Sequence, residues 1–155
     1  MGVDRKRKVS PLVPDFVREH VHSVGRLIRE SDGEAASRLV MAALRDFPTL
    51  NRIAPYLWRD YAFGTHAWIG HREHDDLEDL ISPIGRPLSR LSIRFVEDDW
   101  ASLDALGFAL GRPVAHACAA LLRFAHDYPR VTQLVAPNFE LPSVFRLKEG
   151  LAQWQ

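Results

Sequence analysis

Three polar side chains alternate with three apolar ones between residues 90 and 95. The polar residues are Arg90, Ser92 and Arg94, and the apolar residues are Leu91, Ile93 and Phe95. This period of two predicts a β-strand over residues 89–96 with one cationic face and one buried face. Arginines on an exposed strand are suited to an anionic partner, because each guanidinium donates parallel hydrogen bonds. A merely solvated face, or ion pairs with Glu97 and Asp98, is the alternative interpretation.

This strand needs a second strand, because an isolated β-strand is not stable in water. A partner strand from another molecule would make the protein an obligate homodimer. A partner strand from the same chain would make it an intrachain pseudo-dimer. The sequence leaves both arrangements open, and both require an antiparallel pair.

Two helices are predicted after the strand. Residues 97–99 are three consecutive carboxylates, which favour the positive N-terminal end of a helix, and leucines follow at helical spacing up to residue 110. Gly111 suits the left-handed C-terminal cap of this helix. Pro113 suits the first turn of the next helix, which is predicted to continue to about His126.

Strand, helix, glycine turn and helix, in this order, resemble the ribbon-helix-helix superfamily of Arc-, MetJ- and CopG-like DNA-binding proteins. The resemblance covers residues 90–123 and rests on Arg90–Phe95, Glu97–Asp99, Leu103, Leu106 and Gly111-Arg112. It implies a mainly α fold in which the short strand pairs in a dimer or pseudo-dimer. In this chain the unit would be extended by an N-terminal helical region.

In that family the two paired strands enter the major groove of double-stranded DNA, and their outward side chains contact base edges. The resemblance therefore assigns base contacts to Arg90, Ser92 and Arg94, and a phosphate contact to Arg112. The family often has Ser or Thr at the start of the second helix, where a hydroxyl and free N–H groups hold a phosphate. This chain has Pro113-Val114-Ala115 there, so the hydroxyl is missing.

The first 47 residues are a candidate second, degenerate copy of the same plan. Its strand, helix, turn and second helix would lie at residues 9–13, 15–30, 33 and 35–45. Met41–Arg45 then echoes Ala119–Arg123 at equal distances from Gly33 and Gly111. Accidental similarity is the alternative, and Pro11 lies where the strand would need an N–H group.

The N-terminus is basic. Residues 1–8 are predicted to form a loose arm, in which Arg5, Lys6, Arg7 and Lys8 either contact DNA phosphates or only solubilise the terminus. The rest of the chain is expected to comprise an N-terminal helical region at 9–82, a proline-containing linker at 83–88, the ribbon-helix-helix unit at 89–127, and a tail at 128–155 with a candidate helix at 143–154.

The composition limits the class of protein. A chain of 155 residues that is 46% hydrophobic fits one compact domain or two very small ones. Its 20 basic and 20 acidic residues exclude a uniformly positive surface but allow a local basic patch. A single cysteine, Cys118, excludes an internal disulfide and fits a reducing cytoplasm. No apolar run reaches the roughly 18 residues of a membrane helix, so neither a membrane partner nor a membrane location is expected.

Three histidines form the one group that could hold a metal. These are His66, His71 and His74, with Asp75 and Asp76 beside them. His71 and His74 would share one face of a short acidic helix predicted at 71–81. Spacing fixes no third ligand, so incidental histidines on a solvated helix are favoured, and no metal or cofactor is expected. Nucleophile and phosphate-loop motifs are missing as well, so the chain is not expected to be an enzyme.

The sequence thus predicts a sequence-specific, double-stranded DNA-binding protein. We expect a cytoplasmic bacterial transcription regulator, such as a repressor, that acts by occupying its site. The alternative is a protein-interaction module, an antitoxin or an adaptor, in which the ribbon only dimerises. Residues 49–81, with their aromatic side chains, would then hold a protein partner. The two functions differ in salt dependence, because DNA binding releases counterions.

Overall fold

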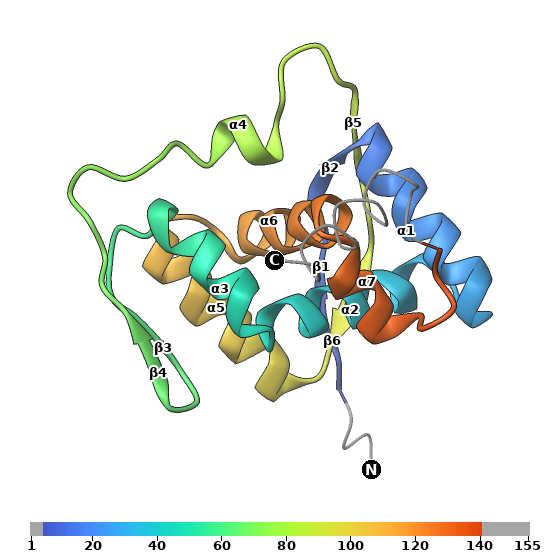
Figure 1. The fold of residues 1–155 in the computed structure, drawn as a ribbon, viewed down its shortest axis with the longest axis horizontal. Coiled ribbons are helices and arrows are strands. Elements are labelled where there is room, and N and C mark those ends of the chain that lie inside the picture. Colours follow the sequence, from blue (N-terminus) through green and yellow to red (C-terminus); the bar gives the residue numbers. More distant parts are fainter. Residues whose placement is uncertain (1–4, 141–155) are drawn as a thin grey trace, which may run out of the picture.

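The computed structural model describes residues 5–140 and is rich in helices, with three small antiparallel strand pairs (Figure 1). Its elements in chain order are β1 (Arg7–Val9), β2 (Leu12–Pro14), α1 (Asp15–Ile28), α2 (Asp32–Leu44), α3 (Phe47–Ile53), the 3-10 helix η1 (Ala54–Tyr56), β3 (Tyr61–Phe63), β4 (His66–Trp68), α4 (Glu78–Ile81), β5 (Leu88–Arg90), β6 (Ile93–Phe95), α5 (Glu97–Leu110), α6 (Val114–Asp127) and α7 (Pro129–Val135).

One two-stranded ribbon joins the beginning of the chain to its middle. β1 pairs with β6, and β2 pairs with β5, both antiparallel. Arg7 lies opposite Phe95, and Pro14 lies opposite Leu88, in one common register. The two pairs are therefore parts of a single ribbon made of residues 7–14 and 88–95. Its strands are interrupted at the centre, where the Leu91 N–H still donates to the Pro11 carbonyl (3.0 Å).

The helices that follow the two ribbon strands form two similar units, separated by 82 residues. α1 begins at Asp15 and α5 begins at Glu97, 82 positions later. α2 begins at Asp32, and α6 begins at Val114, again 82 positions later. We call residues 7–44 the first unit and residues 88–127 the second unit. Each consists of a ribbon strand, a helix of 14 residues and a second helix of 13 or 14 residues.

The turn between the two helices differs from the sequence prediction in the first unit. Arg29 is the left-handed residue that ends α1 (φ 58°), and Gly111 is its equivalent at the end of α5 (φ 68°). Gly33 lies inside α2, whose N-cap is Ser31. The predicted turn at Gly33 was therefore wrong, and the register of the two copies shifts by four residues. The error arose because a left-handed cap was assumed to require glycine, whereas here an arginine adopts it.

A pair of glycines has the same role in both units. Gly25 accepts a hydrogen bond from the Glu30 N–H (2.9 Å), and Gly107 accepts one from the Arg112 N–H (2.9 Å). An added Cβ would lie 2.9 Å from the Glu30 carbonyl oxygen at the first glycine and 2.8 Å from the Arg112 carbonyl oxygen at the second. Both turns therefore close tightly over a glycine, which leaves room for the returning backbone.

The two units share one hydrophobic core, in which α2 and α6 pack against each other and each packs against the first helix of its unit. Equivalent positions are buried in pairs: Val21 and Leu103, Val24 and Leu106, Leu39 and Leu121, Val40 and Leu122, Ala43 and Ala125. The predicted inward face of the second strand is confirmed, because Leu91, Ile93 and Phe95 are at most 2% exposed. Residues 9–82 and 89–127 are thus parts of the same packed body.

Residues 47–87 connect the two units and contain short elements. The β3–β4 hairpin turns at Gly64 (φ 63°) and lies far from the ribbon in the view of Figure 1. The helix predicted over residues 71–81 is limited to α4, so His71 and His74 do not share a helix face. A short helix needs packing more than propensity, and Leu77 and Ile81 supply it here.

The two ends of the described region also differ from expectation. Arg7 and Lys8 belong to β1 and not to a loose arm. After Tyr128 the chain forms α7, which was not predicted, and the helix expected at 143–154 lies outside residues 5–140. Within these residues no single helix is long and apolar enough to span a membrane, and only the pair α5–α6, bent by 94°, reaches that length and composition jointly.

Candidate functional site

The outer face of the ribbon is formed by alternate residues of both strands. We define the ribbon face as Lys8, Ser10 and Leu12 together with Arg90, Ser92 and Arg94. All are exposed except Ser10, which is half-buried. Their neighbours Val9, Pro11 and Val13, like the three apolar residues of the second strand, are buried. The structure therefore adds three residues of the first strand to the three predicted ones. The signal in the sequence was the short alternation of Lys8, Val9 and Ser10, which the basic run before it obscured.

Two cations lie directly opposite each other on the ribbon face. Lys8 is the register partner of Arg94. Neither side chain forms a hydrogen bond or ion pair with any described residue. Like charges placed opposite each other on neighbouring strands destabilise the pair. In the described part of the chain no carboxylate compensates these two charges, so this end of the ribbon is suited to an anionic partner.

Arg90 is held more firmly than Arg94. Its Nη1 donates to the Ser10 carbonyl across the ribbon (2.9 Å), and its own carbonyl accepts from Arg18 Nη1 (2.6 Å). Its register partner is Leu12, which is 42% exposed. One of the five guanidinium N–H groups is used in this contact, and the others remain available for a ligand. Such fixation lowers the entropy cost of binding.

The N-terminal cations divide into two groups. Arg7 pairs with Glu97 (3.2 Å), and its guanidinium stacks over the Trp100 ring at 3.4 Å. It therefore ties β1 to the start of α5. Arg5 and Lys6 are exposed and bind no described side chain. Of the four cations in this run, only Arg7 has a partner among the described residues. Arg5, Lys6 and Lys8 remain available for a ligand, and Lys8 lies on the ribbon face.

Arg112, the predicted phosphate contact, is neutralised by carboxylates. Its Nη1 donates to Glu78 Oε1 (2.6 Å), and its Nη2 lies 3.4 Å from Asp76 Oδ1. Its side chain is only 22% exposed. Burial and the nearby Arg112 charge also lower the pKa of His116. The start of α6 thus presents no free cation, which departs from the prediction.

A shallow depression of about 220 Å³ lies between the ribbon and the start of α2. It is lined by Lys6, Ser92 and Arg94 from the ribbon side and by Ser31, Gly33 and Glu34 from the helix. The helix approaches closely, because an added Cβ on Gly33 would lie 2.7 Å from the Ser92 carbonyl oxygen. The depression therefore continues the ribbon face toward α2, with two cations on its rim.

The histidine group does not converge. His66 packs against Phe47 with tilted rings (centroids 4.4 Å apart), and His74 stacks on Trp58 (4.8 Å). Among residues 5–140 no three His, Cys, Asp or Glu side chains are placed to bind a metal ion. Cys118 is buried, and burial raises the pKa of its thiol to about 12. Its thiol is therefore protonated at neutral pH and is a packing group.

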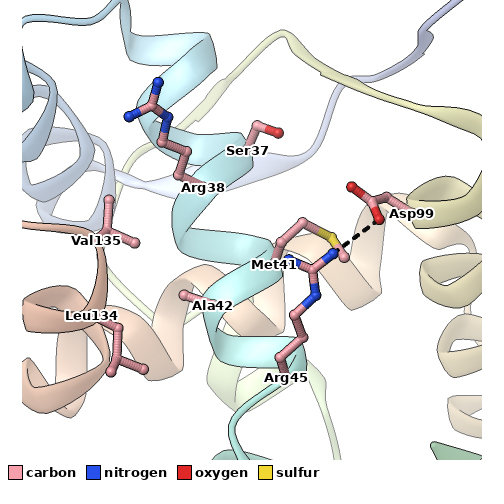
Figure 2. Close-up of a pocket in the computed structure, with 8 residues that line it drawn as sticks. All are labelled: Ser37, Arg38, Met41, Ala42, Arg45, Asp99, Leu134 and Val135. Atoms are coloured by element: carbon pink, nitrogen blue, oxygen red, sulfur yellow. Dashed lines mark hydrogen bonds and ion pairs between the residues drawn. The ribbon is translucent and has the colours of Figure 1, made fainter. Parts of the chain in front are cut away.

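A larger hollow of about 430 Å³ lies between α2, α5 and α7 (Figure 2). Its charged side chains have partners: Arg45 bonds Asp99 (3.2 Å), and Arg38 bonds both Glu30 and Glu34. Figure 2 shows the Arg38 side chain pointing away from the Arg45–Asp99 pair, so the two guanidinium groups do not converge. This hollow has no uncompensated charge to select a ligand.

Comparison with protein-family models, curated proteins and solved structures found no match for this chain. Its function must therefore be inferred from the chemistry of its own surfaces. Of those described, the ribbon face combines exposure, a regular spacing of side chains and charges without partners.

Proposed function

We propose that this chain is a sequence-specific, double-stranded DNA-binding protein of ribbon-helix-helix type. In this proposal the two units form an intrachain pseudo-dimer, and the ribbon face reads base edges in the major groove. The order of strand, helix, turn and helix in both units supports the fold assignment. A B-DNA major groove admits a two-stranded ribbon, so the ribbon can reach the bases without melting the duplex.

The observation that carries the proposal is that Lys8 and Arg94 lie opposite each other and neither pairs with a described carboxylate. A pair of opposed cations weakens the ribbon, and a polyanion would relieve the repulsion. Arginine also matches the O6 and N7 atoms of guanine through two parallel hydrogen bonds. Ser10 and Ser92 lie between the two ends, where hydroxyl groups can donate to or accept from either base of a pair.

Contacts with phosphates would come from the cations beside the ribbon face. Arg5 and Lys6 fit this role because both are exposed and bind no described side chain, whereas Arg112 is occupied by Asp76 and Glu78. A chain with equal numbers of basic and acidic residues would then bind DNA through one local patch. Occupancy of a promoter by such a protein suits a bacterial transcription regulator.

A direct test is the fluorescence anisotropy of a labelled duplex pool, titrated at several salt concentrations with the wild-type chain. The double variant Arg90→Ala/Arg94→Ala removes two ribbon-face cations. The control Arg26→Ala/Arg72→Ala removes two exposed arginines whose side chains bind no described residue and lie outside the ribbon face. We expect salt-dependent binding that the ribbon variant loses and the control keeps, with a slope of about −0.9 per neutralised phosphate.

The proposal fails if the wild-type chain ignores DNA at low salt, or if the control weakens binding as much as the ribbon variant. Circular dichroism of each variant separates loss of binding from loss of fold. Equal losses would indicate that only total charge matters.

A protein-interaction module is the second candidate, and one surface favours it. Phe108 and Trp58 are 66% and 49% exposed, and Arg59 lies over the Phe108 ring at 4.3 Å. They line a hollow of about 300 Å³ with Gly111 and Pro113. Exposed aromatic and arginine side chains are typical of protein interfaces. In this alternative, residues 49–81 bind a protein partner, and the chain would show no salt-dependent binding of DNA.

A further inference from the structure

We infer that the ribbon face recognises an asymmetric DNA site, with one cationic and one partly apolar half, and that a single chain occupies it. This inference rests on the proposed function and names its substrate more closely. It follows from the 82-residue correspondence between the units, because equivalent positions on the ribbon face do not have equivalent side chains.

The correspondence matches the ribbon-face residues in three pairs. These are Lys8 with Arg90, Ser10 with Ser92, and Leu12 with Arg94. The first two pairs are chemically alike: two cations and two serines. The third pair joins an apolar side chain, 42% exposed, to a cation that has no ion-pair partner within residues 5–140. A homodimer would have the same residue at both places, so this asymmetry is a property of the single chain.

Antiparallel pairing concentrates the difference at the two ends of the ribbon. One end has Lys8 opposite Arg94, with Lys6 beside them at the rim of the depression. The other end has Arg90 opposite Leu12. Leu88, which is 37% exposed, lies two residues before Arg90, farther toward this end of the ribbon. The first end therefore offers three cations, and the second offers one cation between two exposed leucines.

The surfaces beside the ribbon also differ in their free positive charge. At the cationic end the depression beside α2 is lined by Lys6 and Arg94 and by Glu34, whose carboxylate pairs with Arg38. In the second unit the cation at the start of α6, Arg112, is held by Asp76 and Glu78 from the connecting segment. Free positive charge is thus concentrated near β1 and β6.

These side chains prefer different bases. Arginine and lysine match the acceptors of guanine, whereas an apolar side chain contacts the methyl group of thymine. Residues 90 and 94 are four positions apart, which is about 13 Å along a strand at about 3.3 Å per residue. With about 3.4 Å per base pair, the two ends would contact bases about four pairs apart. We call the half that contacts Lys8 and Arg94 the guanine half. The half that contacts Arg90 and Leu12, where thymine is expected beside a guanine, is the thymine half, so the site is not an inverted repeat.

The test is selection of bound duplexes from a fully random pool with the full-length chain, followed by native mass spectrometry of the selected complex. We expect a non-palindromic consensus and one chain per duplex. Leu12→Arg makes the third pair of positions alike, so its consensus should shift toward an inverted repeat. Arg94→Ala should reduce discrimination at the guanine half roughly tenfold or more, while the thymine half keeps its preference. Arg26→Ala should select the wild-type consensus.

Each outcome decides between the two proposals. A palindromic wild-type consensus, two chains per duplex, or binding without base preference overturns the asymmetric site while DNA binding itself stands. No enrichment together with no salt-dependent binding overturns the proposed function. If Leu12→Arg does not fold by circular dichroism, the half-site effect of Arg94→Ala still tests the inference, and an equal loss at both halves refutes it.

Discussion

Replacing Arg94 by Gln should strengthen the fold and weaken binding at the same time. Arg94 lies opposite Lys8, and neither forms an ion pair with a described residue. Directly opposed side chains begin about 5 Å apart, and unit charges about 5 to 8 Å apart in water repel by about 0.5 to 0.8 kcal/mol. The variant removes this repulsion but keeps a long polar side chain on the strand.

The expected increase in the free energy of unfolding is therefore about 0.5 kcal/mol, and added salt should reduce it. Urea denaturation followed by circular dichroism measures this difference. On a selected duplex the same variant should lose about 1 to 3 kcal/mol of discrimination, the value of one arginine–guanine contact. Anisotropy at one fixed salt concentration measures the loss.

Arg72→Gln is the matched control, because Arg72 is exposed in the connecting segment and its side chain binds no described residue. It removes the same charge and should change neither quantity by more than a few tenths of a kcal/mol. If Arg94→Gln lowers stability and leaves DNA binding unchanged, the Arg94 cation stabilises the ribbon and does not read DNA, which contradicts the repulsion inferred for the opposed pair.

Three further predictions concern stability. Gly33→Ala should lower the free energy of unfolding, measured in urea, by about 1 to 3 kcal/mol. Alanine is the better helix former, but its Cβ would lie 2.7 Å from the Ser92 carbonyl oxygen. An unchanged stability would show that α2 is free to move away from the ribbon. Arg29→Gly should raise it by up to about 1 kcal/mol, because Arg29 has φ 58°, and a loss would show that the arginine side chain stabilises the turn. Burial, with the nearby His126, lowers the pKa of His20 to about 4, so the folded state favours the neutral ring. The neutral ring therefore contributes at most about 3 kcal/mol to the free energy of unfolding. This contribution is complete above pH 6.5 and is lost as the pH falls toward 4. The variant His20→Gln should flatten that part of the stability–pH curve, and an unchanged slope would exclude His20 as its source.

The second unit could be predicted from sequence because its local signals agree. The strict alternation of residues 90–95 correctly indicated which side chains are buried. Three carboxylates and Gly111 marked the two ends of α5, which are those observed. Propensity, pattern and capping all indicated the same elements, and such agreement is what makes a segment predictable.

The first unit was harder to predict from the sequence, because its residues give conflicting signals for the turn between the two helices. Arg29 occupies a left-handed position that favours glycine, whereas the nearby Gly33, which suggests a turn, lies inside α2. The better signal was the pair Gly25 and Gly107, which are 82 residues apart and have the same close backbone contact. That contact is tertiary information, since a sequence shows a glycine but not the carbonyl that approaches it.

The ribbon-face residues of the first strand were missed for a related reason. The basic run Arg5–Lys8 predicts an arm that includes Lys8, although the buried Val9 follows it directly and Val13 lies on the same inward side. What fixes Lys8 on the ribbon face is its pairing with Arg94, a residue 86 positions later. Pairing between such distant segments depends on the helices that bring them together, and no local pattern encodes it.

A single chain that contains both units can change one end of its ribbon without changing the other. In a homodimer every substitution appears twice, so the two ends stay identical. Here some positions that are alike in both units are fixed by close packing, such as Gly25 and Gly107. A position that differs, Leu12 against Arg94, lies on the exposed face, where packing imposes little. Because both units belong to one chain, their surface residues can differ while their core positions stay similarly packed. An asymmetric ligand can bind a ribbon face whose two ends differ in this way.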